Sequence, residues 1–233
     1  MPPELPAWLA ELLAAALAAL IAITFHEAAH GYAAEALGDP TARQAGRVSL
    51  NPLRHVDPLG TLLLPGLLLA MQLLTIGRVE ALFGWAKPVP VNIALLRHPR
   101  WGMAWVAAAG PAMNLLLAFI AALLAHAGGL FGSESAQLLY RTVALFMLVN
   151  LVLAVFNLLP VPPLDGGRIL TAMLPWRLAL AFARLEPVGL FLVLGTLFLL
   201  PVLIPAFRPT DWGLAHLVAP LFNLVLRAAG HPA

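Results

Sequence analysis

The amino-acid sequence predicts an all-α polytopic membrane protein with about five to six transmembrane helices, one re-entrant segment and short strands in the cytoplasmic-side loops. Three observations support this fold class. Hydrophobic residues make up 61% of the 233 residues, charged residues make up 10%, and mean hydropathy is +0.90, whereas a soluble domain carries about 25% charged residues. Apolar runs long enough to cross a bilayer core of about 30 Å recur along the chain. A His-Glu-x-x-His pattern follows the first of these runs.

The first predicted helix runs from Pro6 to Leu37. Proline suits the first turn of a helix, and Gly38-Asp39-Pro40 supplies a stop. At 1.5 Å per residue this helix is about 48 Å long, which exceeds the bilayer core, so it is tilted or protrudes. His26 and His30 fall in its last third, near one membrane surface.

Two polar connections flank the second apolar segment. Residues 41–58 form the first connection, in which Gly46 to Leu50 are expected to form a short strand. The apolar segment 59–76 is interrupted in its middle by Pro65-Gly66. Residues 78–100 are polar again, and their prolines at positions 88 and 90 place the missing N–H groups on one edge, which suits an edge strand.

Four further apolar segments follow. Trp101 to Ala127, Thr142 to Leu159 and Val188 to Phe207 are predicted spans, whereas Leu214 to Leu226 is short and is either a tilted span or an interfacial helix. The whole chain, 1–233, is predicted to form one domain, with a catalytic core at about 6–175 and accessory C-terminal helices at about 187–228.

His26-Glu27-Ala28-Ala29-His30 predicts a zinc site. Residues four apart lie on one helix face, so both imidazoles can bind one zinc ion, and Glu27 can take a proton from a zinc-bound water. The alternative is two polar histidines packed inside a helical bundle. Ionisable residues inside a membrane segment favour function. The chain has no cysteine, which excludes thiolate ligands and disulfides.

Zinc held by two histidines needs a third protein ligand and an open position for water. Asp165 is the best candidate, because prolines before it prevent a regular helix and Gly166 and Gly167 permit a close backbone approach. Irregular backbone at membrane depth is tolerated when it is buried in protein or lines a wet cavity. The alternative is an ordinary exit turn at the membrane surface.

These patterns together resemble the site-2 proteases, which are intramembrane zinc metalloproteases. The matching residues are His26-Glu27-x-x-His30, Asn157-x-x-Pro160-x-Pro162-x-Leu164-Asp165-Gly166 and Gly110-Pro111-x-x-Asn114. Asn51-Pro52, His55, Asp57-Pro58 and residues 84–92 resemble a compact prokaryotic branch without PDZ or CBS modules, although Ile93 stands where proline is expected. The likeness covers roughly residues 20–170. It implies one zinc ion per chain, transmembrane protein or peptide substrates in a lipid bilayer, and a prokaryotic cytoplasmic membrane.

The number of membrane crossings and the distribution of cations predict the topology. His30 and Asp165 meet only if one of the three apolar segments between them does not cross, and 59–76 is the natural re-entrant candidate. One face then carries most of the cations, which makes it cytoplasmic, so the active site opens toward the cytoplasm. The cations of that face are Arg43, Arg47, Arg54, Arg78, Lys87, Arg97, Arg100, Arg168, Arg177 and Arg184, with Arg227 added if 214–226 crosses; Arg141 and Arg208 lie opposite.

The remaining site hypotheses concern substrate. Asn114 and Asn157 are candidates for orienting substrate or stabilising the oxyanion, with interhelical hydrogen bonding as the alternative. His55 is a candidate that approaches from the loop, with a surface residue or helix cap as the alternative. The segment Pro88-Val89-Pro90-Val91-Asn92 is a candidate for holding substrate as an added strand, with a surface loop as the alternative.

Two other classes of function are compatible with broken, apolar helices that carry polar residues: a small transporter or channel, and a non-catalytic scaffold stapled by metal. Glu27 favours hydrolysis, because neither rival needs an acid beside the first histidine, and no internal repeat supports a transporter. A net charge of +2 without a Lys/Arg run argues against nucleic acid as a partner. The sequence carries no signal for oligomeric state. As physiological role, both regulated intramembrane proteolysis and clearance of signal-peptide remnants are consistent with it.

Overall fold

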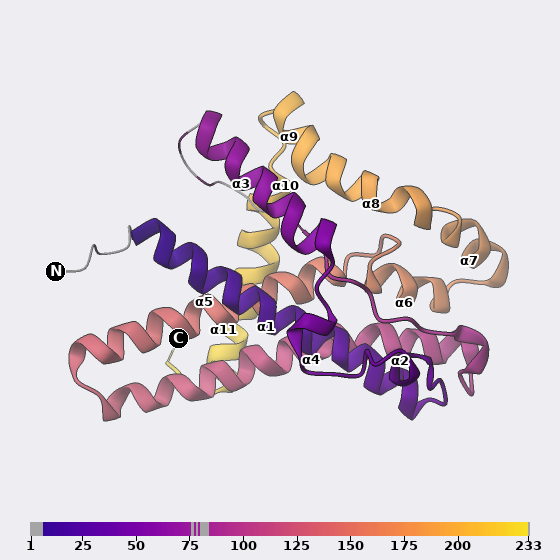
Figure 1. Ribbon diagram of the computed structural model, residues 1–233, viewed down its shortest axis with the longest axis horizontal. Coiled ribbons are helices and arrows are strands. Elements are labelled where there is room, and N and C mark those ends of the chain that lie inside the picture. Colours follow the sequence, from indigo (N-terminus) through magenta and orange to yellow (C-terminus); the bar gives the residue numbers. More distant parts are fainter. Residues whose placement is uncertain (1–6, 76, 78, 80–83, 233) are drawn as a thin grey trace.

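Three long antiparallel helices form the body of the protein. The computed structural model describes residues 7–75, 77, 79 and 84–232. Helices α1 (Ala7–Ala36), α4 (Pro99–Ala125) and α5 (Ser133–Asn157) lie side by side, and α4 runs opposite to the other two (Figure 1). His26 and His30 near the end of α1 therefore lie at the same end of the body as the residues that follow α5.

Small side chains let α4 and α5 approach closely. The buried core between them contains four alanines of α4 and three larger residues of α5, a pattern that favours helix association in membranes. These residues are Ala118, Ala121, Ala122, Ala125, Val143, Met147 and Leu151.

The chain between α1 and α4 is built from short helices and loops. They are α2 (Thr41–Gln44), η1 (Pro52–Arg54), η2 (Pro58–Leu63), α3 (Leu64–Thr75) and η3 (Ile93–Leu95). Asn51 and Asp57 begin η1 and η2 as N-caps, each followed by proline. The Asp57 carboxylate accepts hydrogen bonds from Leu59 N (3.0 Å) and Gly60 N (2.7 Å).

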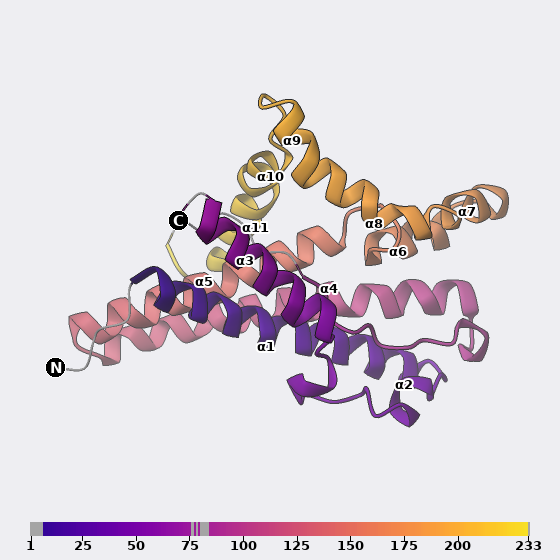
Figure 2. The ribbon, with the colours of Figure 1, turned by 45° about the horizontal axis from the view of Figure 1, so that its top comes forward.

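The predicted interruption at Pro65-Gly66 was wrong, because residues 58–75 are helical throughout. A π-helical stretch ends at Leu63, and Pro65 is the second residue of α3. The helical run changes from π-helix to α-helix directly before Pro65, and the Gly60 carbonyl accepts a hydrogen bond from Trp85 N outside the helix. Among the described residues of α3, none is buried, so this helix stands away from the body (Figure 2).

The strands predicted in the loops were also wrong: the described part of the chain is helix and irregular loop, without a strand. Gly46 has φ +65°, a left-handed turn that interrupts residues 46–50. The backbone groups of residues 87–92 bond largely to side chains rather than to a neighbouring strand. Arg47 donates to Lys87 O (2.5 Å), and Asp39 accepts from Asn92 N (2.6 Å).

The C-terminal third wraps around the end of the body and returns along it. It consists of α6 (Asp165–Met173), α7 (Trp176–Ala183), α8 (Glu186–Leu194), η5 (Gly195–Leu199), α9 (Leu200–Leu203), α10 (Pro209–Gly213), η6 (Leu214–Val218) and α11 (Ala219–Ala228). Val218 and Val225 of the last helical run join the core of α4 and α5.

Five helices of the described residues are long and apolar enough to cross a membrane. They cover 8–36, 58–75, 99–130, 133–157 and 186–203. This confirms the class of polytopic helical membrane protein, with five candidate spans among the described residues. Whether the helix over 58–75 crosses or is re-entrant stays a prediction. The segment 214–226 is part of a helical run over 209–228 and is not among the five.

Candidate metal centre

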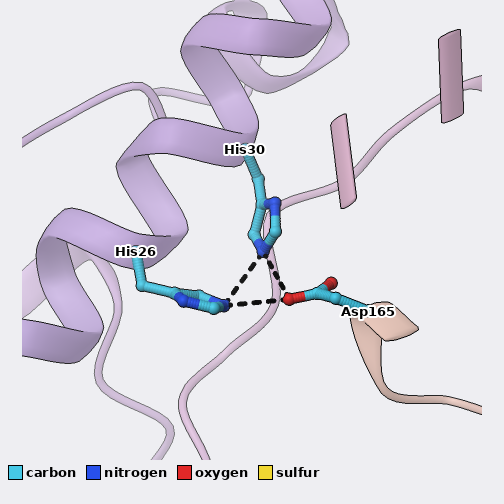
Figure 3. Close-up of side chains that lie close together, drawn as sticks. All are labelled: His26, His30 and Asp165. Carbon is cyan, nitrogen blue, oxygen red and sulfur yellow. Dashed lines mark hydrogen bonds and ion pairs between the residues drawn. The ribbon is translucent and has the colours of Figure 1, made fainter. Parts of the chain in front are cut away.

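Three donor atoms from two distant parts of the chain meet beside α4. His26 and His30 project from successive turns of α1, and Asp165 is the first residue of α6 (Figure 3). The two histidine Nε2 atoms are 3.0 Å apart. Asp165 Oδ2 lies 3.2 Å from His26 Nε2 and 3.3 Å from His30 Nε2. All three side chains are almost completely buried.

These donors fit a zinc ion. Ligands about 2 Å from a tetrahedral zinc lie about 3.3 Å from one another, close to the spacing of these three atoms. Asp165 Oδ2 is buried and has no hydrogen-bond partner among the described residues, although a buried carboxylate oxygen ordinarily has one. Two imidazoles and a carboxylate are also the donor set of many hydrolytic zinc sites.

The outer nitrogens of both histidines are held by hydrogen bonds. His30 Nδ1 lies 2.7 Å from Val106 O, a backbone carbonyl that can only accept, so Nδ1 carries the proton. His26 Nδ1 lies 2.6 Å from Asn114 Oδ1 and donates to it in the same way. Both Nε2 atoms therefore present lone pairs toward Asp165, the arrangement that metal-binding histidines require.

Asp165 lies against the two imidazoles, with its Oδ2 within 3.3 Å of both Nε2 atoms. The residue reaches this position because the loop before α6 folds tightly against the start of that helix. A Cβ atom on Gly166 would lie 2.2 Å from Leu158 O, so only glycine permits this approach.

Glu27 lies next to the first histidine and is half-buried. Its Oε2 accepts a hydrogen bond from Val89 N at 2.9 Å, so the carboxylate contacts the segment 88–92 that was singled out as a candidate substrate strand. Of this segment, Val89 is buried, and Asn92 N is bonded to Asp39 Oδ2.

The other candidate residues, Asn114, Asn157 and His55, make hydrogen bonds within the protein. Asn114 is fully buried behind His26 and links helices. Asn157 donates within its own helix to Leu153 O at 3.0 Å. His55 is buried in the loop, where its Nε2 donates to Ser49 O at 2.8 Å and its Nδ1 has no partner among the described residues. The roles of these three residues toward substrate stay predictions.

Two buried polar residues have contacts that the sequence did not predict: Asn150, and Arg47, which was expected only as a cation of the cytoplasmic face. Asn150 of α5 is fully buried and accepts a hydrogen bond from Asn114 Nδ2 at 2.9 Å. Its isolated position inside an apolar run is a signal that could have identified it. Arg47 is buried and donates to backbone carbonyls of the loop, a role for which its sequence context carries no signal.

The fold and the donor set define the class: a membrane protein with a hydrolytic type of zinc site in its helical bundle. The profile of peptidase family M50 matches residues 126–200. The "Putative zinc metalloprotease YwhC" of Bacillus subtilis is 38% identical over 187 residues, which cover 78% of both chains.

The proteins named "Putative zinc metalloprotease Rip2" of Mycobacterium tuberculosis and Mycolicibacterium smegmatis are 34% and 29% identical, over 79% of this chain and 66% of each relative. No solved structure matches significantly. The chain belongs to peptidase family M50, the site-2 protease family. It is a zinc metalloendopeptidase, and this removes the transporter and scaffold alternatives.

Gly110→Ala is expected to lower zinc content and peptidase activity. A Cβ atom at this position of α4 would lie 2.5 Å from His26 Cε1 and 2.6 Å from His30 Cε1, so both ligand rings would have to shift. Zinc per chain is measured by elemental analysis of the purified protein. The control is Gly129→Ala, where a Cβ atom meets nothing within 4 Å. Equal zinc content and activity in both variants would show that the rings are not confined as described.

Proposed function

We propose that the protein hydrolyses peptide bonds of transmembrane substrate helices at a site that opens toward the cytoplasm. One observation supports the proposal most strongly: the donors His26 and His30 and the neighbouring acid Glu27 belong to α1, which is itself long and apolar enough to cross the membrane. A peptide bond that reaches this site therefore does so at or below the membrane surface.

In this proposal His26, His30 and Asp165 hold one zinc ion. Zinc at such a site supplies Lewis-acid polarisation of the scissile carbonyl and a more acidic water. Glu27 accepts the proton of the attacking water and delivers it to the leaving amine. The Val89 N–H holds Oε2 of Glu27, which leaves Oε1 to accept that proton. The backbone N–H therefore orients the base.

A substrate helix must unwind locally, because its carbonyl groups are bonded within the helix. We propose that residues 88–92 hold the unwound substrate in an extended form. The contact between Val89 N and Glu27 supports this, because it places the segment beside the base. Pro88 and Pro90 have no N–H, so the segment would hold substrate mainly through carbonyl groups that accept from substrate N–H groups.

Asn157 and His55 remain candidates for orienting substrate or stabilising the oxyanion, whereas the contacts of Asn114 favour orientation of His26. The proposal treats the chain as one domain, 1–233, whose core at about 6–175 carries the site and whose helices at about 187–228 are accessory. Regulated proteolysis of membrane proteins and clearance of signal-peptide remnants both fit this chemistry.

The proposed topology makes 59–76 re-entrant in a prokaryotic cytoplasmic membrane. Contacts at the start of this helix support it. Trp85 N donates to Gly60 O (3.1 Å), and Thr61 Oγ1 donates to Trp85 O (2.8 Å). These contacts bring Trp85 close to Gly60, which supports entry and exit of the segment on one side of the membrane. The cation-rich loops lie on that side, which is cytoplasmic by the positive-inside rule.

Glu27→Gln is expected to keep zinc and lose turnover. The amide is nearly isosteric but accepts no proton at neutral pH, so kcat should fall by about 100- to 10,000-fold. Zinc content and cleavage of a transmembrane model substrate are measured in detergent. Glu11→Gln, the same change earlier in α1, is the matched control and should retain activity. His26→Ala should instead lose the metal. Near-normal turnover of Glu27→Gln would exclude Glu27 as the base.

Single cysteines at Gln44, Lys87 and Ser133 test the topology, because the chain has no native cysteine. All three positions are exposed. Gln44→Cys and Lys87→Cys should react with a membrane-impermeant thiol reagent only from the cytoplasmic side, and Ser133→Cys only from outside. Labelling of positions 44 and 87 from opposite sides would contradict the re-entrant segment.

A further inference from the structure

We propose that Asn150 of α5 is a positioning residue of the zinc site: acting through the side-chain amide of Asn114, it determines which nitrogen of His26 carries the proton. The inference rests on the proposed role of His26 as a zinc ligand. It concerns a residue of α5 whose hydrogen bonds join it to Phe146 and Asn114 and to none of the three donors.

A chain of hydrogen bonds crosses the three helices of the body. Asn150 Nδ2 donates to Phe146 O at 2.9 Å. Asn114 Nδ2 donates to Asn150 Oδ1 at 2.9 Å and to Ala22 O at 3.3 Å. Asn114 Oδ1 lies 2.6 Å from His26 Nδ1. Both asparagines are fully buried, each within a segment long enough to cross the membrane.

Backbone carbonyls determine which groups donate and which accept in this series of hydrogen bonds, because a backbone carbonyl can only accept. Phe146 O requires the NH₂ group of Asn150, so Asn150 presents its oxygen to Asn114. Asn114 must then present its own NH₂ group to Asn150 and Ala22, and its oxygen faces His26. His26 consequently carries its proton on Nδ1 and keeps the Nε2 lone pair for the metal.

Reversing one amide in this chain is unfavourable. If Asn114 turned over, its oxygen would face Asn150 Oδ1 and the Ala22 carbonyl, and its NH₂ group would face the N–H of His26. Two acceptors and two donors would then face each other in a dry interior, where a polar group without a hydrogen-bond partner is strongly unfavourable. Asn150 contributes to this cost, because its Oδ1 accepts a hydrogen bond from the NH₂ group of Asn114 and would repel the oxygen of a reversed amide.

The two ligand histidines differ in this respect. His30 Nδ1 is held directly by the Val106 carbonyl, which cannot turn over. His26 Nδ1 is held by a side-chain amide, which can. Of the two histidines, only His26 depends on an amide that can rotate, and the contact with Asn150 fixes the orientation of that amide.

The zinc dissociation constant, measured by competition with a chelator of known affinity, tests the proposal. Asn150→Leu should weaken zinc binding by about tenfold, since outer partners of metal ligands contribute 10- to 100-fold. Asn150→Asp keeps an oxygen facing Asn114 and should bind zinc almost as tightly as the unaltered protein. Substituting cobalt should show the same ranking, as a changed visible absorption spectrum in Asn150→Leu and an unchanged one in Asn150→Asp.

A double variant separates this relay from ordinary packing. If Asn150 acts only through Asn114, then Asn114→Leu/Asn150→Leu should bind zinc no more weakly than Asn114→Leu alone. Met147→Ala, a packing defect one turn earlier in α5, should lower the Tm without changing the zinc dissociation constant. If Asn150→Leu does not fold, Asn150→Ala replaces it in every comparison.

Three outcomes would overturn the proposal: unchanged zinc affinity in Asn150→Leu, additive losses in the double variant, or an equal loss in Met147→Ala. Each of these differs from failure of the proposed zinc site, which would show as retained zinc in His26→Ala. Loss of zinc in His26→Ala together with an unaffected Asn150→Leu would reject the relay alone.

Discussion

The close approach of three buried donor atoms is the constraint on which the rest of the structure depends. His26 Nε2, His30 Nε2 and Asp165 Oδ2 lie 3.0 to 3.3 Å apart, and in the absence of a cation these electron-rich atoms repel one another in a medium of low dielectric constant. The surrounding helices must therefore hold them together. Close approach of α4 supplies that confinement, because the space beside Gly110 that a Cβ atom would occupy is taken by both imidazole rings.

The same constraint explains why polar residues lie deep in an apolar bundle. Each ligand histidine needs an acceptor for its second nitrogen, and a membrane interior offers no water for that purpose. Val106 O serves His30, and the Asn114–Asn150 pair serves His26. The Val106 carbonyl and the two side-chain amides therefore lie inside apolar segments, where a polar group without a partner is costly.

Charged residues of the loop between α1 and α4 stabilise irregular backbone in a similar way. Arg47 is buried and donates to carbonyls of Arg54 and Lys87. Asp39 is buried and accepts from Thr41 and Asn92. Burial raises the pKa of the Asp39 carboxyl, but the hydrogen bonds from Thr41 and Asn92 lower it overall, so this carboxylate stays ionised and keeps residues 88–92 in place. That segment in turn orients Glu27.

The sequence by itself determined the class of fold, the family, the histidine pair and the acid beside it, because these follow from local properties. Hydropathy and helical period act over a few turns, and the spacing of His26 and His30 places them on one face whatever surrounds the helix. Asp165 was also identified from the sequence, since prolines and glycines mark an irregular turn around an isolated acid. Its approach to the histidines became visible only with the structure.

Tertiary structure alone decided the rest. The strand expected at 87–92 does not form, because the side chains of Arg47 and Asp39, which are distant in sequence, bond to backbone groups that a neighbouring strand would have used. The strand expected at 46–50 does not form either, and Gly46 adopts a left-handed conformation at its start. Pro65 did not interrupt its helix: the run changes from π-helix to α-helix directly before it and continues. The contact between Glu27 and Val89 and the link from Asn150 to His26 join residues 62 or more positions apart. Such pairings depend on how the helices pack, and local sequence patterns do not encode that packing.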